Sequence, residues 1–197
     1  MPRAQAEQQS EREVLHELSI VDVGCGGGIL AEELARSGAH VLGIDAAKQN
    51  IAVAEEHAKL SGVGGGSLKY RHVTADDLIQ EKKTFDVVVC SEVLEHVSDL
   101  HLMVNQLMQL VAPRGALYIT TMNKTTLSYG IVAAERLLKL VPDGTHDWNK
   151  FVKPEVLTEQ LSCSGLGAAY NPLINRWHPV PDLSVNYLLF AHRKAAC

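Results

Sequence analysis

Apolar residues gather in short runs that alternate with amphipathic stretches along most of the chain. Short runs rich in β-branched residues are typical of buried strands, whereas apolar residues spaced three and four positions apart predict helices. Strands are predicted at residues 19–23, 40–44, 68–73, 85–90, 116–121 and 185–191, and helices at 29–36, 48–60, 100–110 and 153–161. This alternation predicts right-handed βαβ crossovers, and therefore an α/β fold with a doubly wound, mostly parallel sheet.

The alternation stops after Met122, where residues 123–150 contain a helix candidate, TTLSYGIVAAERLLKLV. We expect this segment to be a helical lid inserted over one edge of the sheet. The expected organisation is one domain with four parts: a polar segment at 1–18, a core at 19–122, the lid at 123–150, and a helix and strand at 151–197 that complete the sheet.

Composition narrows the class of protein. The chain has 197 residues, 46% of them hydrophobic and 5% aromatic, with a formal net charge of -5, which favours a globular domain over a nucleic-acid binder. The four cysteines are scattered along the chain and no two of them have C-x-x-C spacing, so neither a disulfide framework nor a thiolate zinc site is indicated. No run approaches the roughly 18 apolar residues of a membrane span, and the glutamate-rich residues 1–18 do not resemble an import signal.

A glycine-rich stretch, VDVGCGGGIL, spans residues 21–30. In a parallel sheet the first strand-to-helix turn is where the backbone approaches a ligand, and glycines there remove the Cβ obstacle. A dinucleotide fingerprint requires a glycine at the last position of G-x-G-x-x-G, where this chain has Ile29. The stretch therefore predicts a small-molecule site but argues against a dinucleotide pyrophosphate.

The motif D-V-G-C-G-G-G resembles the glycine loop of class I methyltransferases that use S-adenosylmethionine. The resemblance implies that Asp22 lies near the amino-acid end of this cofactor, while Gly24 and Gly26 let the backbone cradle it. Asp45, at the end of the second strand, would accept both ribose hydroxyls, or would instead cap the next helix. Asp76 and Asp77, two acids after the third strand, would meet the adenine amino group or serve as helix caps.

A second informative stretch, CSEVLEHVSDL, follows the fourth strand. Glu92, Glu95 and His96 are spaced i, i+3 and i+4, so their side chains converge on one side if the segment is helical. Carboxylate and imidazole together are acceptable ligands for Mg²⁺, Mn²⁺ or Zn²⁺, and a bound cation would lower the pKa of a phenol. The alternative is that the acids only begin a helix and complement its dipole.

Longer segments resemble the ubiquinone-biosynthesis O-methyltransferases, which methylate polyprenylated catechol-type rings. The matching segments are VDVGCGGGILAEELARSGAHVLGID, FDVVVCSEVLEHV, TTMNKTTLSY, VPDGTHDWNKFVKPE and YNPLINRW followed by VNYLL. The resemblance implies that Ser91 also contacts S-adenosylmethionine, and that Glu92, Glu95 and His96 hold a divalent metal, expected to be Mg²⁺. His96, Glu92 and His146 are the expected catalytic residues, although a loop histidine such as His146 could equally hydrogen-bond its own backbone.

The resemblance also implies an acceptor, a location and partners. The acceptor would be a polyprenyl dihydroxybenzoate or quinol, and other coenzyme Q biosynthesis proteins are candidate partners. TTMNKTTLSY and HDWNKF resemble the mitochondrial branch, so we expect peripheral binding to the matrix side of the inner membrane. The lid helix has an apolar stripe and more basic than acidic residues, which suits binding to a lipid surface. The alternative is that this helix packs on the sheet. The apolar positions are Leu127, Ile131, Ala134, Leu138 and Val141, the basic ones are Lys124, Arg136 and Lys139, and the acidic one is Glu135.

Two parts of the chain depart from the family pattern. Residues 1–18 have no match, where family members carry an arginine that helps to close the cofactor site. The join from Ser164 to Pro172 is short, so we expect the strand before YNP to be missing or abbreviated. Two alternatives therefore stay open: a methyltransferase for another small phenolic acceptor, and a non-catalytic subunit of a quinone-biosynthesis complex.

Overall fold

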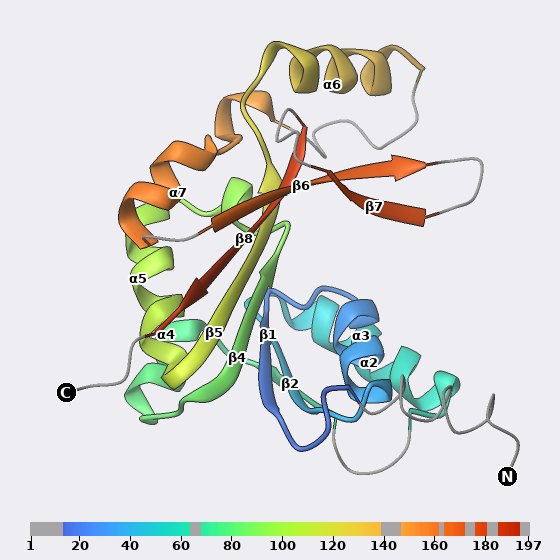
Figure 1. Ribbon diagram of the computed structural model, residues 1–197. Helices are drawn as coiled ribbons and strands as arrows, with labels where there is room; N and C mark the ends of the chain where they lie inside the picture. The colour runs from blue at the N-terminus through green and yellow to red at the C-terminus, as the bar shows by residue number, and fades with distance from the viewer. Residues whose placement is uncertain are drawn as a thin grey trace, which may run out of the picture. The chain divides into compact units, whose positions relative to one another are not determined.

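The computed structural model describes residues 14–63, 68–138, 147–161, 164–171, 176–180 and 185–193. Their strands form one sheet in the order β3-β2-β1-β4-β5-β8-β6-β7 (Figure 1). The chain divides into two compact units, which are described separately. The first unit runs to Cys90 and also includes residues 104–117 and Arg193, and the second contains residues 91–103 and 118–192.

Parallel strands form the sheet of the first unit. β1 pairs with β2 on one side and with β4 on the other, and β2 pairs with β3. The predicted strands are thus confirmed, with small shifts at their ends: β1 is Ser19–Val23, β2 His40–Asp45, β3 Leu68–His72 and β4 Phe85–Ser91.

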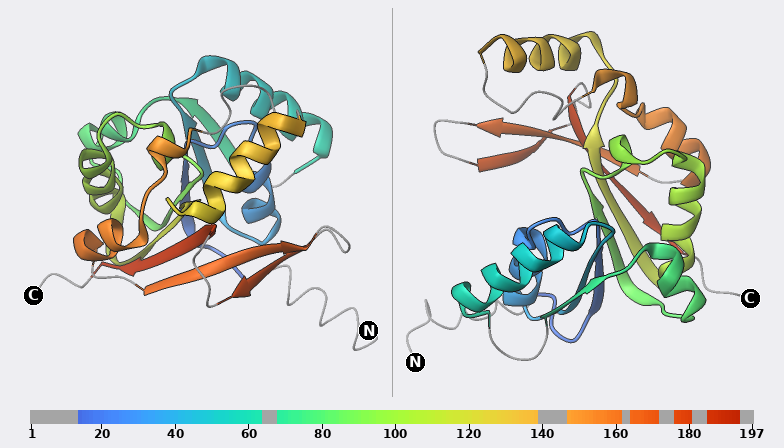
Figure 2. Two further views of the ribbon diagram at one scale, coloured as in Figure 1. Left: turned by 90° about the horizontal axis from the view of Figure 1, so that it is seen from above. Right: turned by 180° about the vertical axis from the view of Figure 1, so that it is seen from behind.

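Two helices pack against this sheet, α2 (Ile29–Arg36) and α3 (Lys48–Ser61). Figure 1 shows them on one side of β1 and β2, and the rear view in Figure 2 agrees. Ala31 and Ala35 of α2 are buried in one cluster with Ile20 and Val41 of the strands. These small side chains let the helix approach the sheet closely, which fixes the position of the loop that precedes α2.

A short helix, α4 (Ala75–Gln80), was not predicted from the sequence. It begins with a capping box, in which the Thr74 hydroxyl accepts a hydrogen bond from the Asp77 backbone and the Asp77 carboxylate accepts one from the Thr74 backbone. Six residues are too few to show a helical period, so only the cap could have indicated this helix.

The fifth strand is longer than predicted. We expected a strand from residue 116, but β5 runs from Val111 to Met122. Backbone hydrogen bonds to the chain end hold this part extended, because Arg114 N donates to Arg193 O at 3.1 Å and Arg193 N donates to Gly115 O at 3.0 Å. Partners so far along the chain cannot be read from a local pattern.

The second unit adds antiparallel strands. β6 (Ser164–Asn171) pairs with β7 (Arg176–Val180) and with β8 (Asn186–His192), and β6 lies beside β7 in both views of Figure 2. The expectation of a missing or abbreviated strand before YNP is therefore wrong, because β6 occupies that join. Glycine and alanine dominate its sequence, SGLGAAYN, which gave no strand signal.

The remaining helices follow the predictions closely. The helix predicted at 100–110 is confirmed, and the lid candidate forms a helix up to residue 138. The helix bounds are α5 Leu100–Leu110, α6 Thr126–Leu138 and α7 Pro154–Leu161, with 3₁₀ turns η1 at Leu94–His96 and η2 at Trp148–Lys150. Among the described helices, none combines the length and apolarity needed to cross a bilayer.

Candidate functional site

The glycine loop connects β1 to α2 and has an unusual backbone. Gly24, Gly26 and Gly28 all have positive φ angles, of 77°, 53° and 84°, a region that side chains other than glycine rarely occupy. The start of the loop is anchored on β2, because the backbone N–H groups of Gly24 and Cys25 donate to Ile44 O at 2.8 and 2.9 Å. The glycines thus form a tight turn at the carboxyl ends of the parallel strands.

Asp45 ties the glycine loop to the start of α3. Its carboxylate accepts hydrogen bonds from Gly26 N at 3.0 Å, Ala47 N at 2.7 Å and Asn50 Nδ2 at 3.1 Å. The bond from Ala47 N is part of what helix capping would require, since Ala47 is the residue before α3. The hydrogen bond from Gly26 N is not needed for capping, and it places the Asp45 carboxylate beside the glycine loop. Its ribose role stays a prediction.

Asp22, near the end of β1, has a strongly perturbed environment. Its side chain is 2% exposed, and Oδ2 has no hydrogen-bond partner among the described residues. Burial, with a smaller effect from the charge of Asp45, raises its pKa to about 7. Buried carboxylates are normally paired. A buried carboxylate oxygen next to the loop that has no partner among the described residues therefore fits a cationic ligand group.

The loop also leaves room for a ligand. A Cβ atom placed on Gly26 would have nothing within 4 Å, so the space above this residue is open. Cys25 does not offer a reactive group there, because burial, followed by the charges of Asp22 and Asp45, raises the pKa of its thiol to about 12. The residues of the loop thus fit non-covalent binding of S-adenosylmethionine.

The two acids after β3 have separate partners. Asp77 belongs to the capping box of α4, whereas the Asp76 carboxylate accepts from Gln80 Nε2 at 2.6 Å and Gln106 Nε2 at 3.4 Å. The cap interpretation therefore holds for Asp77. The adenine contact of Asp76 stays a prediction.

In the second unit, the E-x-x-E-H segment is not α-helical. Leu94–His96 form a single 3₁₀ turn, and Glu92 lies before it with a φ of 54°. The spacing argument for convergence assumed a helix and therefore does not apply. A positive φ at a non-glycine residue costs energy and commonly marks functional segments. It is sustained here by a backbone bond from Glu92 N to Thr120 O at 2.9 Å.

Two threonines of β5 donate hydrogen bonds to the carboxylates of this segment. Thr120 Oγ1 donates to Glu92 Oε1 at 3.0 Å, and Thr121 Oγ1 donates to Glu95 Oε2 at 2.9 Å. Ser91 Oγ lies 2.7 Å from Thr120 Oγ1. Sequence reasoning missed the threonines as site residues, although both stand in the segment TTMNKTTLSY that carried the family resemblance.

The predicted metal ligands do not form a preformed metal centre. Glu95 is buried on Thr121, whereas His96 is exposed. Within the described part of the chain, no three His, Cys, Asp or Glu side chains come together closely enough to hold a metal ion. The metal role of Glu92, Glu95 and His96 stays a prediction, and His146 lies outside the described residues.

A cavity of about 330 Å³ lies in the second unit beside η1. Three cationic side chains and no acidic one line it. The lining residues are Leu94, Val97, Ser98, Leu100, Lys124, Lys150, Phe151, Val152, Lys153 and Val156. Lys124 is held in place, since its Nζ donates to Asn149 O at 2.7 Å and lies 5.0 Å from the Trp148 ring centroid. The cavity suits an anionic group with an apolar body.

Comparison with known proteins shows the family. Residues 21–119 match the family described as a methyltransferase domain. A ubiquinone biosynthesis O-methyltransferase of Rhizobium etli is 43% identical over 189 residues, which cover 92% of this chain and 75% of that protein. The chain belongs to the ubiquinone biosynthesis O-methyltransferase family. Its human mitochondrial member is 44% identical over 183 residues, which cover 88% of this chain and 50% of the human protein.

Solved structures confirm the fold of this family member. The magnesium protoporphyrin IX methyltransferase of Synechocystis PCC 6803 with bound S-adenosylhomocysteine has a TM-score of 0.66, with 20% identity, 97% of this chain and 79% of that chain covered. A methyltransferase of Methanosarcina mazei that depends on S-adenosylmethionine has a TM-score of 0.68, with 17% identity, 100% of this chain and 99% of that chain covered. At such identities the likeness concerns the fold alone, and it agrees with the predicted class I methyltransferase fold.

Proposed function

We propose that the chain transfers a methyl group from S-adenosylmethionine to a phenolic oxygen of a polyprenylated catechol or quinol in ubiquinone biosynthesis. The observation that carries the cofactor half of this proposal is the buried Asp22 carboxylate, which has no described partner on Oδ2 beside an open glycine loop. The acceptor half is supported by the names of the related proteins.

The first unit would bind the cofactor. Asp22 pairs with the ammonium of the methionine portion, and this charge pair offsets the desolvation that now raises the pKa of Asp22. Gly24 and Gly26 present backbone without side chains, and Asp45 accepts the ribose hydroxyls in charge-assisted hydrogen bonds. The contact of Ser91 with the cofactor stays a prediction from the family resemblance. When bound, the cofactor supplies a methyl group activated by its cationic sulfur.

The second unit would handle the acceptor proton. His96 is exposed, and histidine is the residue type that most readily takes a proton near neutral pH. Glu92, braced by Thr120, stabilises the imidazolium that forms. Removing the phenolic proton creates the anionic oxygen that attacks the methyl carbon, and positioning of the two reactants supplies much of the acceleration. His146 is the second proposed base.

The acceptor is proposed to be a carboxylated ring, a polyprenyl dihydroxybenzoate, because the cavity of the second unit combines lysines with apolar side chains. Lysines recognise a carboxylate as point charges. The wild-type chain should therefore methylate a prenylated dihydroxybenzoate with a higher kcat/KM than the same ring without its carboxylate. Lys153→Gln should reduce that preference about three- to tenfold, whereas Lys59→Gln on α3 should leave it unchanged. Equal kcat/KM values for the two rings would contradict the assignment.

We propose that α6 makes peripheral contact with a membrane. The proposed location of the protein is the matrix side of the inner mitochondrial membrane. The human relative is named as mitochondrial, and Leu127 and Tyr129 of α6 are 53% and 58% exposed. Exposed apolar side chains on a helix support weak and reversible surface binding. Wild-type protein should float with vesicles that contain anionic lipid, and a Leu127→Ser/Tyr129→Ser variant should remain in the soluble fraction. Equal flotation of the two proteins would contradict this role.

Calorimetric titration with S-adenosylhomocysteine tests the cofactor half. We expect micromolar binding by the wild type, and at least tenfold weaker binding by Asp45→Asn because a charge-assisted acceptor is lost. Asp86→Asn is the matched control, since Asp86 is an exposed acid of the same unit whose carboxylate accepts hydrogen bonds from the Ser19 hydroxyl and backbone N–H. A folded wild-type chain that does not bind would contradict the proposal and favour a non-catalytic subunit.

A further inference from the structure

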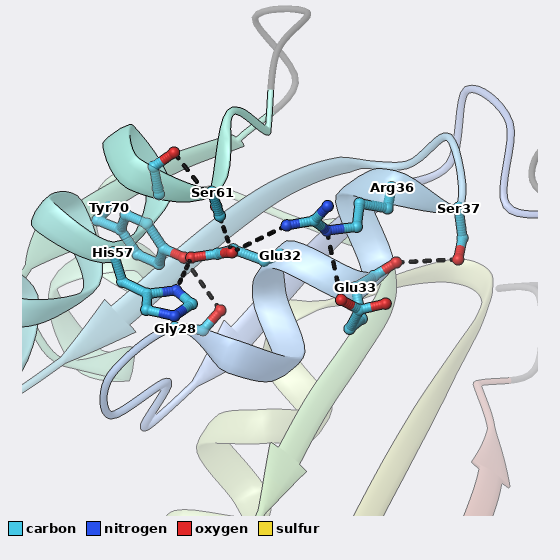
Figure 3. Close-up of polar contacts among 9 residues, drawn as sticks. Gly28, Glu32, Glu33, Arg36, Ser37, His57, Ser61 and Tyr70 are labelled. Carbon is cyan, nitrogen blue, oxygen red and sulfur yellow. Dashed lines mark hydrogen bonds and ion pairs between the residues drawn. The ribbon is translucent and has the colours of Figure 1, made fainter.

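Tyr70 of β3 lies directly beneath the last residue of the glycine loop. Its hydroxyl donates to Gly28 O at 3.1 Å (Figure 3). Gly28 is the residue that caps the start of α2, with its φ of 84°. The same carbonyl accepts the first hydrogen bond of the helix, from Glu32 N at 2.9 Å. One side chain from a neighbouring strand thus bonds to the point where the loop becomes a helix.

The phenol ring fits there because two residues lack side chains. A Cβ atom on Gly28 would lie 2.8 Å from Tyr70 Cζ and 2.9 Å from Ala54 Cβ. A Cβ atom on Gly43 of β2 would lie 2.5 Å from Tyr70 Cδ1. These distances are too short for real contacts, so the ring occupies space that only glycines leave. Tyr70 is therefore locked between β2 and the loop, with little freedom to move its hydroxyl.

A second set of contacts, made by side chains of α3, fixes the first turn of α2. Glu32 is buried, and its carboxylate lies 2.6 Å from His57 Nδ1 and accepts from Ser61 Oγ at 2.7 Å (Figure 3). Burial alone would raise the pKa of Glu32, but the hydrogen bonds from His57 and Ser61 hold it below its usual value. The ionised carboxylate thus anchors the helix while Tyr70 anchors the loop.

Burial has a useful effect on the tyrosine itself. It raises the pKa of the Tyr70 phenol above its usual value, and the charge of Glu32 adds to this effect. A tyrosine phenol is protonated near neutral pH in any case, and this shift only widens the pH range over which Tyr70 remains a hydrogen-bond donor. Tyr70 is therefore a permanent donor to Gly28 O.

We propose that Tyr70 is a positioning residue that holds the glycine loop ready for the cofactor by its hydrogen bond to Gly28. This inference rests on the proposed function, in which the loop binds S-adenosylmethionine. A loop with three left-handed residues loses much conformational freedom when it is ordered. If the protein orders it in advance, binding does not carry that cost. Loss of the hydroxyl should therefore weaken cofactor binding and leave the chemical step unchanged.

Tyr70→Phe tests the proposal, because it keeps the ring between the glycines and removes only the hydroxyl. The full chain is titrated with S-adenosylhomocysteine, and KM for S-adenosylmethionine and kcat are measured on the same samples. We expect both Kd and KM to rise about three- to tenfold, as for loss of one neutral hydrogen bond. We expect kcat and the far-ultraviolet circular dichroism spectrum to stay unchanged.

Tyr118→Phe is the matched control, since it removes the same hydroxyl from a ring that packs on Phe190 in the second unit. It should leave both Kd and KM at wild-type values. Tight binding by Tyr70→Phe, equal to that of the wild type, would overturn the positioning role alone. A fall in kcat with unchanged KM would also overturn it. Failure of the folded wild type to bind would overturn the proposed function and this inference with it.

Discussion

Replacing Asp22 with asparagine should make the ligand-free protein more stable and at the same time impair its binding of S-adenosylhomocysteine. The carboxylate is buried, and its Oδ2 has no described partner. Its pKa is about 7 instead of 3.8, so the folded protein keeps a proton that the unfolded chain releases between these values. Stability should therefore fall as the pH rises from about 4 to about 7, and the full cost is present above pH 7.

The size of the effect follows from the pKa values. The separation between 3.8 and about 7 corresponds to roughly 4 kcal/mol of lost stability at high pH. Asparagine recovers only part of this, because its amide must also be buried and partly lacks hydrogen bonds, so we expect a gain of about 1–3 kcal/mol. For a chain of this size each kcal/mol raises Tm by about 2–4 °C. Asp22→Asn should therefore melt several degrees above the wild type at pH 8.

The gain should shrink as the pH is lowered. At about pH 4 and below, the wild-type carboxyl is protonated in both the folded and the unfolded protein, so the advantage of the variant should be lost there. Thermal denaturation at several pH values between 4 and 8 measures this dependence. Asp86→Asn is the control, because hydrogen bonds from the Ser19 hydroxyl and backbone N–H hold the pKa of Asp86 below its usual value, so this substitution should bring no gain.

Binding should respond in the opposite direction. The cofactor's ammonium requires an ionised Asp22, so wild-type affinity for S-adenosylhomocysteine should fall about tenfold between pH 8 and pH 6, as the competent fraction falls. Asp22→Asn should bind at least tenfold more weakly at pH 8 and show little of this dependence. A variant that melts below the wild type at pH 8, or that binds as well as the wild type, would refute the reasoning.

Three further predictions follow from the second unit. Thr121→Val should lower stability by about 1–3 kcal/mol in chemical denaturation, because the buried Glu95 loses its hydroxyl donor; an unchanged midpoint would contradict that role. Trp148→Phe removes the hydrogen bond from Nε1 to the carbonyl oxygen of Thr125, the residue before α6, so this helix should open more often and limited proteolysis should cut it faster than in the wild type. Equal cleavage rates would contradict this role of Trp148. From the metal prediction we expect chelation to abolish methyl transfer and added Mg²⁺ to restore it; full activity after chelation would show that the prediction is wrong.

The first half of the fold could be predicted because its signals are local. Buried β-branched runs and amphipathic helices with clear stops placed β1 to β4, α2 and α3 within one or two residues. β6 escaped prediction because a strand of glycine and alanine has no apolar period, and the start of β5 escaped because its extended shape depends on Arg193. Both depend on pairing with distant segments, which a window of sequence does not contain.

The candidate site was predictable to a similar extent. The glycine loop, Asp22 and Asp45 could be named from one motif, and the structure places Asp45 in contact with Gly26. Tyr70 could not, since it is separated from Gly28 by 42 positions and nothing in its own segment points to the loop. The E-x-x-E-H segment shows the converse problem, because its spacing brings the three side chains together only in a helix, whereas the backbone turns at Glu92. Spacing identifies chemistry only where the local conformation is already known.

Methyl transfer itself is the most direct test of the account. The purified chain is incubated with S-adenosylmethionine and a short-chain prenyl dihydroxybenzoate, with Mg²⁺ present, and the product is identified by mass spectrometry. The account predicts one added methyl group on a ring oxygen, and a rate that falls steeply in Asp22→Asn and Asp45→Asn but not in Asp86→Asn. A folded chain that binds S-adenosylhomocysteine but methylates neither this ring nor its decarboxylated form would contradict the assignment.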